Sequence, residues 1–124
     1  MGKNVKIVRS DQIEAVQPLK PGCHERWIFN KNNTPTDNLT FMAAIIEPGK
    51  SSGLHVHDVE ECFYVLRGRG KVLIGDEEHG LEPDLCIYCP PATPHNFINE
   101  STCESLSLLA VLGKTEFKTT LLEK

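Results

Sequence analysis

The feature that most restricts the fold is a series of short runs of β-branched and aliphatic residues, separated by clusters of Gly, Pro, Asn and Asp. Such runs, bounded by turn-forming residues, are typical of strands. We predict strands at Val5–Val8, Glu25–Phe29, Leu39–Ile46, Cys62–Arg67, Lys71–Ile74, Leu85–Cys89, Asn96–Ile98 and Leu106–Leu112. The chain has 124 residues, enough to bury one hydrophobic core. We therefore expect a single all-β domain over residues 1–124, built as a sandwich, jelly roll or barrel.

Helix and loops are expected to be peripheral to this core. The only candidate helix is Asp11–Val16, capped by Ser10 or Asp11, and it is too short to organise a helical core. The polar segment Lys31–Asn38 contains a proline and is predicted to be a surface loop. The acidic segment Gly75–Gly80 is predicted to form a solvated hairpin tip.

The residues with the clearest chemistry are His55, His57, Glu61 and His95. Two histidines separated by one residue point to the same face of a strand, with their Cα atoms roughly 6.6 Å apart. Both imidazoles can therefore reach one ion, and a carboxylate partly neutralises its charge. The alternative is that His55 and His57 are two surface histidines on a solvated face.

Two segments match a known family pattern. Residues 49–68 read Gly-x5-His-x-His-x3-Glu-x6-Gly, and this resembles the first cupin motif at every fixed position. Residues 90–99 read Pro-x-Ala-x-x-His-x3-Asn and resemble the second cupin motif, except that Ala92 stands where the family usually has Gly. The flanking strands fit the family loosely.

Two departures from the cupin pattern fall in turns. Ala92 and Asp84 both occupy positions where the family usually has glycine. Asp tolerates a left-handed backbone better than most residues, whereas Ala is strained at a positive φ. We expect these departures to alter loop geometry rather than the ligands.

The resemblance implies a double-stranded β-helix, that is, a jelly-roll barrel with a metal ion in its lumen. It maps the metal ligands onto His55, His57, Glu61 and His95, with one divalent transition metal per subunit. It also implies a homodimer, because many small cupins pair through terminal strands. Iron, manganese, nickel and zinc all suit a site of three histidines and one glutamate.

Charge and cysteine content narrow the functional classes. The formal net charge is −4 and no cluster of Lys and Arg is present, so we expect no nucleic-acid partner. No apolar stretch reaches the roughly 18 residues of a membrane span, and the first residues do not form a signal peptide. Five cysteines without an export signal indicate a reducing compartment, so we expect a cytoplasmic protein.

The cysteines themselves are interpreted as structural. Cys86 and Cys89 form C-x-x-C within a predicted strand, where residues three apart point to opposite faces and cannot easily share an ion. By the same alternation, Cys62 points away from Glu61. We assign no role to Cys23 and Cys103, which stand in loop-like surroundings.

A few further residues are candidates for contact with a small-molecule ligand. Arg26 is expected on an early strand bordering the lumen, where a guanidinium could clamp a carboxylate, although we favour a surface ion pair. Phe63 and Tyr88 are the other candidates for substrate binding. Tyr64, Tyr88, Arg26 and Glu60 are candidate general acids or bases.

Three functional hypotheses remain open from the sequence. An octahedral ion with four protein ligands keeps two positions for water, substrate or dioxygen, which permits an isomerase, a lyase or decarboxylase, or, with iron, a dioxygenase acting on a small oxygen-bearing molecule. The alternative is a non-catalytic module that binds or senses a sugar or organic acid through the metal. A purely structural barrel is the third.

Overall fold

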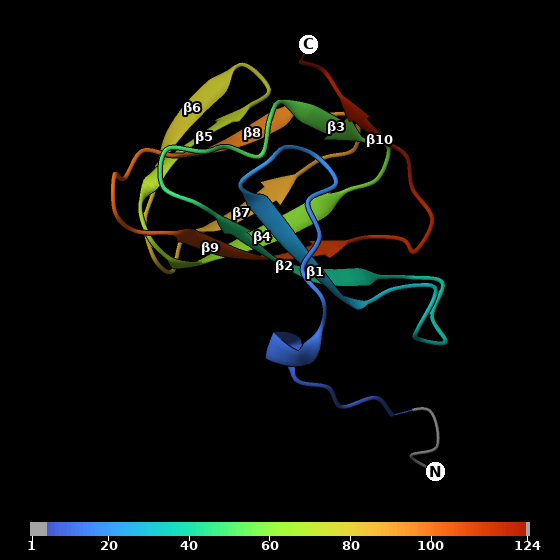
Figure 1. The fold of residues 1–124 in the computed structure, drawn as a ribbon. Coiled ribbons are helices and arrows are strands. Elements are labelled where there is room, and N and C mark those ends of the chain that lie inside the picture. Colours follow the sequence, from blue (N-terminus) through green and yellow to red (C-terminus); the bar gives the residue numbers. More distant parts are fainter. Residues whose placement is uncertain (1–4, 124) are drawn as a thin grey trace.

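The computed structural model describes residues 5–123, and its regular structure is almost entirely β (Figure 1). One short 3-10 helix, η1, covers Ser10–Gln12. The strands are β1 (Cys23–Phe29), β2 (Thr40–Ile46), β3 (His55–His57), β4 (Glu61–Arg67), β5 (Gly70–Ile74), β6 (Glu77–Leu81), β7 (Cys86–Cys89), β8 (His95–Asn99), β9 (Leu106–Leu112) and β10 (Thr119–Leu121). No helix within residues 5–123 has the length and apolar character needed to cross a membrane.

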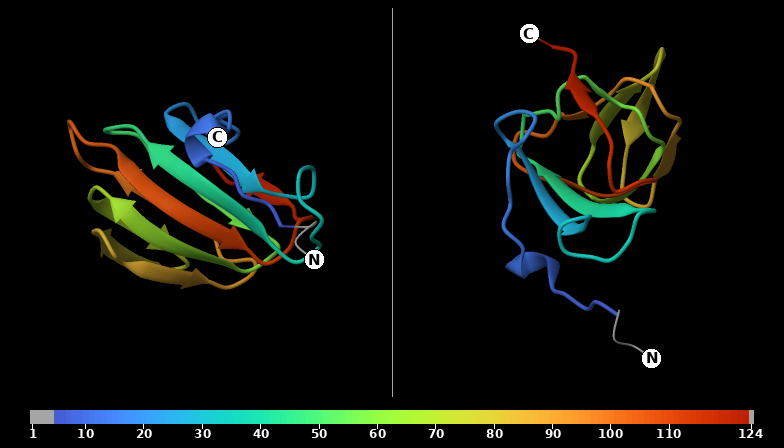
Figure 2. Two further views of the ribbon diagram at one scale, coloured as in Figure 1. Left: turned by 90° about the horizontal axis from the view of Figure 1, so that it is seen from below. Right: turned by 90° about the vertical axis from the view of Figure 1, so that its right-hand side faces the viewer.

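The strands form two five-stranded antiparallel sheets that face one another. Sheet A has the order β1-β2-β9-β4-β7, and sheet B has the order β10-β3-β8-β5-β6. Figure 2 shows the strands of sheet A side by side on the left and, on the right, the two sheets seen along the barrel. Each sheet pairs strands that are far apart in sequence, as in the pairing of β2 with β9 and of β3 with β8. The predicted jelly-roll barrel is confirmed.

The core lies between the sheets because their strands alternate buried and more exposed side chains. In β2 and β9 every second residue is buried, which is the pattern expected when one face of an antiparallel sheet is covered. The buried apolar cluster is Cys23, Met42, Ala44, Ile46, Phe63, Val65, Val72, Leu81, Cys89, Phe97, Leu106, Leu108, Ala110 and Leu112. Cys23, expected in a loop, is the first residue of β1 and is only 1% exposed.

The predicted strands differ from the structure where a strand has few apolar residues or no partner. Residues 5–8 do not form a strand, because no other strand of the described residues pairs with their backbone. The predicted helix Asp11–Val16 is reduced to η1. Three strands were not predicted: β3 and β10, which have three residues each, and β6, four of whose five residues are exposed. In the predicted hairpin tip Gly75–Gly80, only Gly75 and Asp76 form the turn, and residues 77–80 belong to β6, which pairs with β5.

The turns before the second motif have left-handed backbone where the family usually has glycine. Asp84 has φ 75° and Ala92 has φ 59°. The amide of Ala92 donates to the carbonyl of His57 at 2.8 Å, which ties this turn to β3. Ala92 therefore has the positive φ at which strain is predicted for alanine.

Candidate metal centre

Three histidines from two neighbouring strands converge inside the barrel. His55 and His57 lie on β3, His95 lies on β8, and His55 is the register partner of His95. Their candidate ligand nitrogens all lie within 4.8 Å of one another. Because β3 is antiparallel to β8 and side chains alternate, this pairing directs all three rings to the same interior point.

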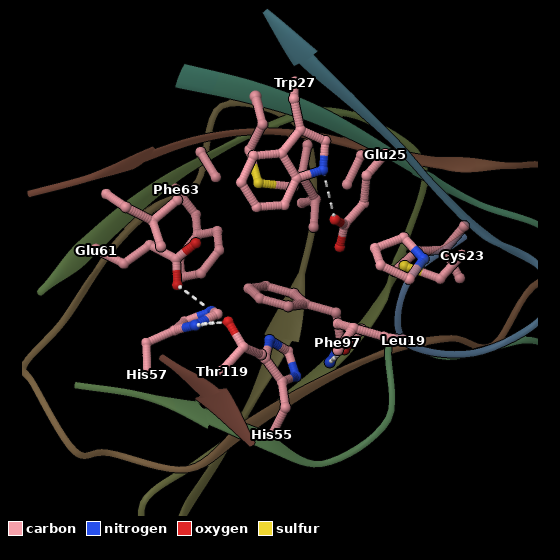
Figure 3. Close-up of a pocket in the computed structure, with 18 of the residues that line it drawn as sticks. Leu19, Cys23, Glu25, Trp27, His55, His57, Glu61, Phe63, Phe97 and Thr119 are labelled. Carbon is pink, nitrogen blue, oxygen red and sulfur yellow. Dashed lines mark hydrogen bonds and ion pairs between the residues drawn. The ribbon is translucent and has the colours of Figure 1, made fainter. Parts of the chain in front are cut away.

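Glu61 reaches the same point from the opposite sheet. It is the first residue of β4, and its side chain is almost completely buried. Its Oε1 atom lies 3.4 Å from Nε2 of His57 and 3.4 Å from Nε2 of His95. The structure thus brings together the four residues that the sequence motif singled out (Figure 3 labels His55, His57 and Glu61).

Hydrogen bonds on the outer side of the rings fix which nitrogen faces inward. Nδ1 of His55 lies 2.8 Å from the carbonyl oxygen of Gly53, and Nδ1 of His95 lies 2.9 Å from that of Thr93. A carbonyl only accepts, so both Nδ1 atoms carry a proton, and in the neutral form of each ring the Nε2 atom presents its lone pair to the centre. Nδ1 of His57 lies 2.8 Å from Oγ1 of Thr119 on β10.

The centre contains polar atoms that no protein group satisfies. Oε1 of Glu61 and Nε2 of His95 are buried and have no hydrogen-bond partner among the described residues. Leaving such atoms unpaired costs roughly 1–3 kcal/mol each, and more for a charged group. A divalent cation between the imidazole nitrogens and the carboxylate removes this cost. Three imidazoles and a carboxylate without thiolate are a donor set suited to iron, manganese, nickel or zinc.

Burial keeps two of the imidazoles neutral. Desolvation, reinforced by the neighbouring imidazoles, lowers the pKa of His55 to about 4 and that of His57 to about 3. Desolvation also acts on His95, but Cys89, Glu61 and Thr93 outweigh it and raise its pKa to about 10. Desolvation raises the pKa of Glu61, and His95 partly offsets the rise. Without a cation, His95 and Glu61 therefore share a proton, which a divalent ion would displace.

A cavity of about 350 Å³ opens beside the histidines. Most of its wall is apolar and comes from sheet A: Met42, Ala44, Ile46, Phe63, Leu108, Ala110 and Leu112. No lysine or arginine lines it in the described part of the chain. At the end away from the histidines, β1 contributes Cys23, Glu25 and Trp27 (Figure 3).

Of the predicted ligand-contacting residues, only Phe63 lines this cavity. Tyr64 is exposed and donates a hydrogen bond to Asp84 at 2.6 Å, and Tyr88 is exposed and donates one to Glu60 at 2.8 Å. Both tyrosines point outward because they have the opposite strand parity to the residues that line the cavity. Their hydroxyls are therefore remote from the candidate centre.

For Arg26 the sequence favours a surface ion pair, with a place beside the lumen as the alternative, and the described residues show neither. Arg26 lies on the other face of β1, and its Nε atom is buried without a hydrogen-bond partner among the described residues. It borders a separate hollow together with His24 and Glu47, while Glu25 and Trp27 on either side of it line the cavity. The sequence analysis missed Glu25 and Thr119. The apolar neighbours Trp27 and Ile28 have opposite parity, so the sequence does not identify Glu25 as inward-facing. Thr119 sits in a strand of three residues that leaves no periodic signal.

The prediction that Cys86 and Cys89 point to opposite faces is confirmed, but the interpretation of both as buried structural cysteines is wrong for Cys86. Cys86 is exposed and Cys89 is buried, so the two thiols of the C-x-x-C segment lie on opposite faces of β7. Cys62 is exposed on the outer face of β4, away from Glu61.

The fold is a small jelly-roll barrel, and three histidines converge in its lumen. This combination is the class of β-barrel that can hold a metal ion. The family model described as "Cupin domain" matches residues 42–112, and the chain belongs to the cupin family. An uncharacterised protein of Methanocaldococcus jannaschii is 30% identical over 98 residues, which is 77% of this chain and 78% of that protein.

Solved structures show the same fold. The polyketide cyclase RemF from Streptomyces resistomycificus superposes with a TM-score of 0.77 at 21% identity, covering 96% of this chain and 87% of that chain. A predicted oxalate decarboxylase from Thermotoga maritima superposes with a TM-score of 0.75 at 23% identity, covering 88% of this chain and 99% of that chain. At these identities the likeness establishes the fold alone.

Proposed function

We propose that this cupin binds one divalent transition metal through His55, His57, Glu61 and His95 and acts on a small oxygen-bearing organic molecule in its lumen. The observation that carries the proposal is the pair of buried, unsatisfied atoms, Oε1 of Glu61 and Nε2 of His95, at a point where imidazole nitrogens from two strands also converge. A bound ion would supply Lewis-acid polarisation of substrate oxygens or, if it is iron, activation of dioxygen.

The lining of the cavity supports a substrate with an apolar body. Its wall is mainly aliphatic and aromatic, and none of its described residues is a lysine or arginine that could neutralise a carboxylate remote from the metal. A dianion such as oxalate would leave one charge unpaired in an apolar space, which is costly. Between the two enzymes named above, the cavity therefore favours chemistry like that of the polyketide cyclase over that of the oxalate decarboxylase.

Metal analysis of natively purified protein, with oxygen uptake measured across small carbonyl compounds and sugar acids, tests this proposal. We expect about one metal ion per chain. Iron with oxygen uptake would identify a dioxygenase, and another metal with product formation but no uptake would identify an isomerase or lyase. Binding without turnover would favour the sensing module instead. Protein that stays metal-free in excess divalent salt would contradict all of these.

We also propose that the protein forms a homodimer in the cytoplasm. Large apolar side chains are exposed on the isolated chain, including Ile7 (91%), Tyr88 (60%) and Leu66 (48%), and a second copy would cover such surface. The chain from residue 5 to η1 extends away from the barrel (Figure 1). All five cysteines are free thiols, which suits a reducing compartment. Light scattering should give twice the chain mass, and a monomer at micromolar concentration would contradict the dimer.

A further inference from the structure

The cavity has a second polar end, formed by Cys23, Glu25 and Trp27 on β1. In Figure 3 Glu25 and Cys23 lie across the ring of Phe97 from His55 and His57, and the carboxyl group of Glu25 points into the space between. These three residues share one face of β1, and all three line the cavity. The backbone of Glu25 is fixed on both sides, by its pairing with Ala44 of β2 and by a bridge to Val16.

Glu25 is a buried carboxyl group that has no cationic partner among residues 5–123. It is only 6% exposed, and its Oε1 atom accepts a hydrogen bond from the indole Nε1 of Trp27 at 3.1 Å. Phe117 stacks on Trp27 with an interplanar angle of 4°, which holds the indole in place. The other oxygen, Oε2, has no partner within the described chain and belongs to a side chain that lines the cavity.

The surroundings of Glu25 favour its protonated form. Desolvation raises its pKa to about 7; the Trp27 hydrogen bond opposes the rise and the charge of Glu61 adds to it. The other titratable groups that line the cavity are Cys23, His55, His57 and Glu61. Burial raises the pKa of the Cys23 thiol to about 12, so it stays neutral, and none of these groups offers Glu25 a compensating cation at neutral pH.

We propose that Glu25 is a specificity-determining residue, whose neutral carboxyl group donates a hydrogen bond from Oε2 to an acceptor oxygen of the ligand at the end remote from the histidines. This inference rests on the proposed function, because the other end of the ligand binds at the candidate metal centre. The ligand class is a molecule with metal-chelating oxygens at one end, an apolar body, and a carbonyl oxygen at the other end. A carboxylate in the latter position is rejected, because it would meet an acidic group in an apolar enclosure.

A matched pair of probes tests this selectivity. In 3,4-dihydroxyacetophenone and 3,4-dihydroxybenzoate the same catechol group can chelate the metal, while the remote group is a ketone in one and a carboxylate in the other. Zinc-loaded wild-type protein at slightly acidic pH should bind the ketone about tenfold more tightly by calorimetry, since one buried hydrogen bond is at stake. Glu25→Gln keeps a donor but has no acidic proton, so the preference should fall to about onefold.

Glu47→Gln is the matched control, because Glu47 follows β2 at the same end of sheet A but on its outer face beside His24. It should retain the wild-type preference. Equal binding of both probes by the wild type, failure of the ketone probe to bind, or an unchanged preference in Glu25→Gln would overturn the inference.

A second measurement needs no ligand. Trp27 is the only tryptophan and is hydrogen-bonded to Glu25, so its fluorescence should report ionisation of this carboxyl group. The zinc-loaded wild type should show a transition with a midpoint of about pH 7 that Glu25→Gln lacks and Glu47→Gln retains. A transition shared by all three proteins, or absent from the wild type, would refute the role of Glu25. Failure to bind zinc would instead refute the proposed function, and the same titration of metal-free protein would still decide whether Glu25 is the buried acid.

Discussion

The two polar ends of the cavity deal with buried charge in different ways. At the histidine end, side chains from β3, β4 and β8 converge and leave atoms of Glu61 and His95 unsatisfied, an arrangement that a cation completes. At the other end, one strand presents a single carboxyl group that a tryptophan N–H supports and that a proton neutralises. One enclosed space can therefore contain a cluster of side chains suited to a metal ion and, apart from it, a carboxyl group that a proton alone can neutralise.

The largest expected effect is at the histidine end. Replacing His57 with alanine removes one of three imidazoles and leaves Glu61 with one fewer partner, so we expect zinc affinity to fall by at least about a hundredfold. Zinc should then no longer raise the melting temperature, since the rise depends on the ratio of free metal to its dissociation constant. Calorimetry and thermal unfolding with and without zinc measure both effects.

His24→Ala is the matched control for this change. His24 lies on β1 and pairs with Glu47 on the outer face, so its loss should leave zinc affinity unchanged. Equal zinc affinity in His57→Ala and the wild type would remove the distinction between the two ends of the cavity.

At the acid end, the expected effect is on stability and depends on pH. Glu25 has its pKa raised from 4.5 to about 7, so the folded state holds a proton that the unfolded state releases within this range. Wild-type stability attributable to Glu25 is therefore complete below about pH 4.5 and is lost as the pH rises through 7. Glu25→Gln should be more stable than the wild type by about 2–3 kcal/mol at alkaline pH and nearly equal to it at acidic pH.

Urea unfolding of both proteins as a function of pH measures this difference directly. The histidines titrate in both proteins, so subtracting one stability curve from the other isolates Glu25. A constant difference across the pH range would mean that Glu25 is not a buried acid.

A smaller loss of zinc affinity is expected when the hydrogen bond between Thr119 and His57 is removed. The hydroxyl oxygen of Thr119 lies 2.8 Å from Nδ1 of His57. When Nε2 faces a metal, Nδ1 carries the proton and donates a hydrogen bond to this hydroxyl. Thr119→Val keeps the shape but removes this acceptor, so zinc affinity should fall by about tenfold. Thr120→Val, at the next position of β10, is the control and should have no effect on zinc binding. An unchanged zinc affinity in Thr119→Val would show that the hydrogen bond from Thr119 does not help His57 to bind the metal.

The sequence predicted the histidine end far better than the acid end, and the reason is physical. His55 and His57 share a face by strand alternation, and the cupin motif adds Glu61 within the same seven consecutive residues. Glu25 and Arg26 are adjacent charged residues on one strand, and the sequence alone does not say which of the two faces inward. That depends on the register of β1 against β2, in which Glu25 pairs with Ala44.

For the fold, too, the sequence predicts the elements with a local pattern and not those that depend on tertiary contacts. Strands with regular apolar alternation, such as β2 and β9, could be predicted because one face of each is buried. β10 is stabilised by its partner β3 and by contacts such as the hydrogen bond from the amide of Leu54 to Glu123, which are tertiary and leave no local pattern. Residues 5–8 have the alternation of a strand but no partner strand.

The smallest expected effect concerns the turn that positions the histidine end. Ala92 has φ 59°, a conformation that costs an L-residue with a Cβ roughly 1–2 kcal/mol and that glycine adopts freely. Glycine also gains freedom in the unfolded chain, so Ala92→Gly should raise the free energy of unfolding by only about 0.5–1 kcal/mol. Ala43→Gly, in the extended backbone of β2, is the control and should lower stability. Zinc affinity should not change in Ala92→Gly, because the amide that binds the His57 carbonyl is retained. A loss of stability in this variant would show that the turn is not strained and that alanine is as suitable there as glycine.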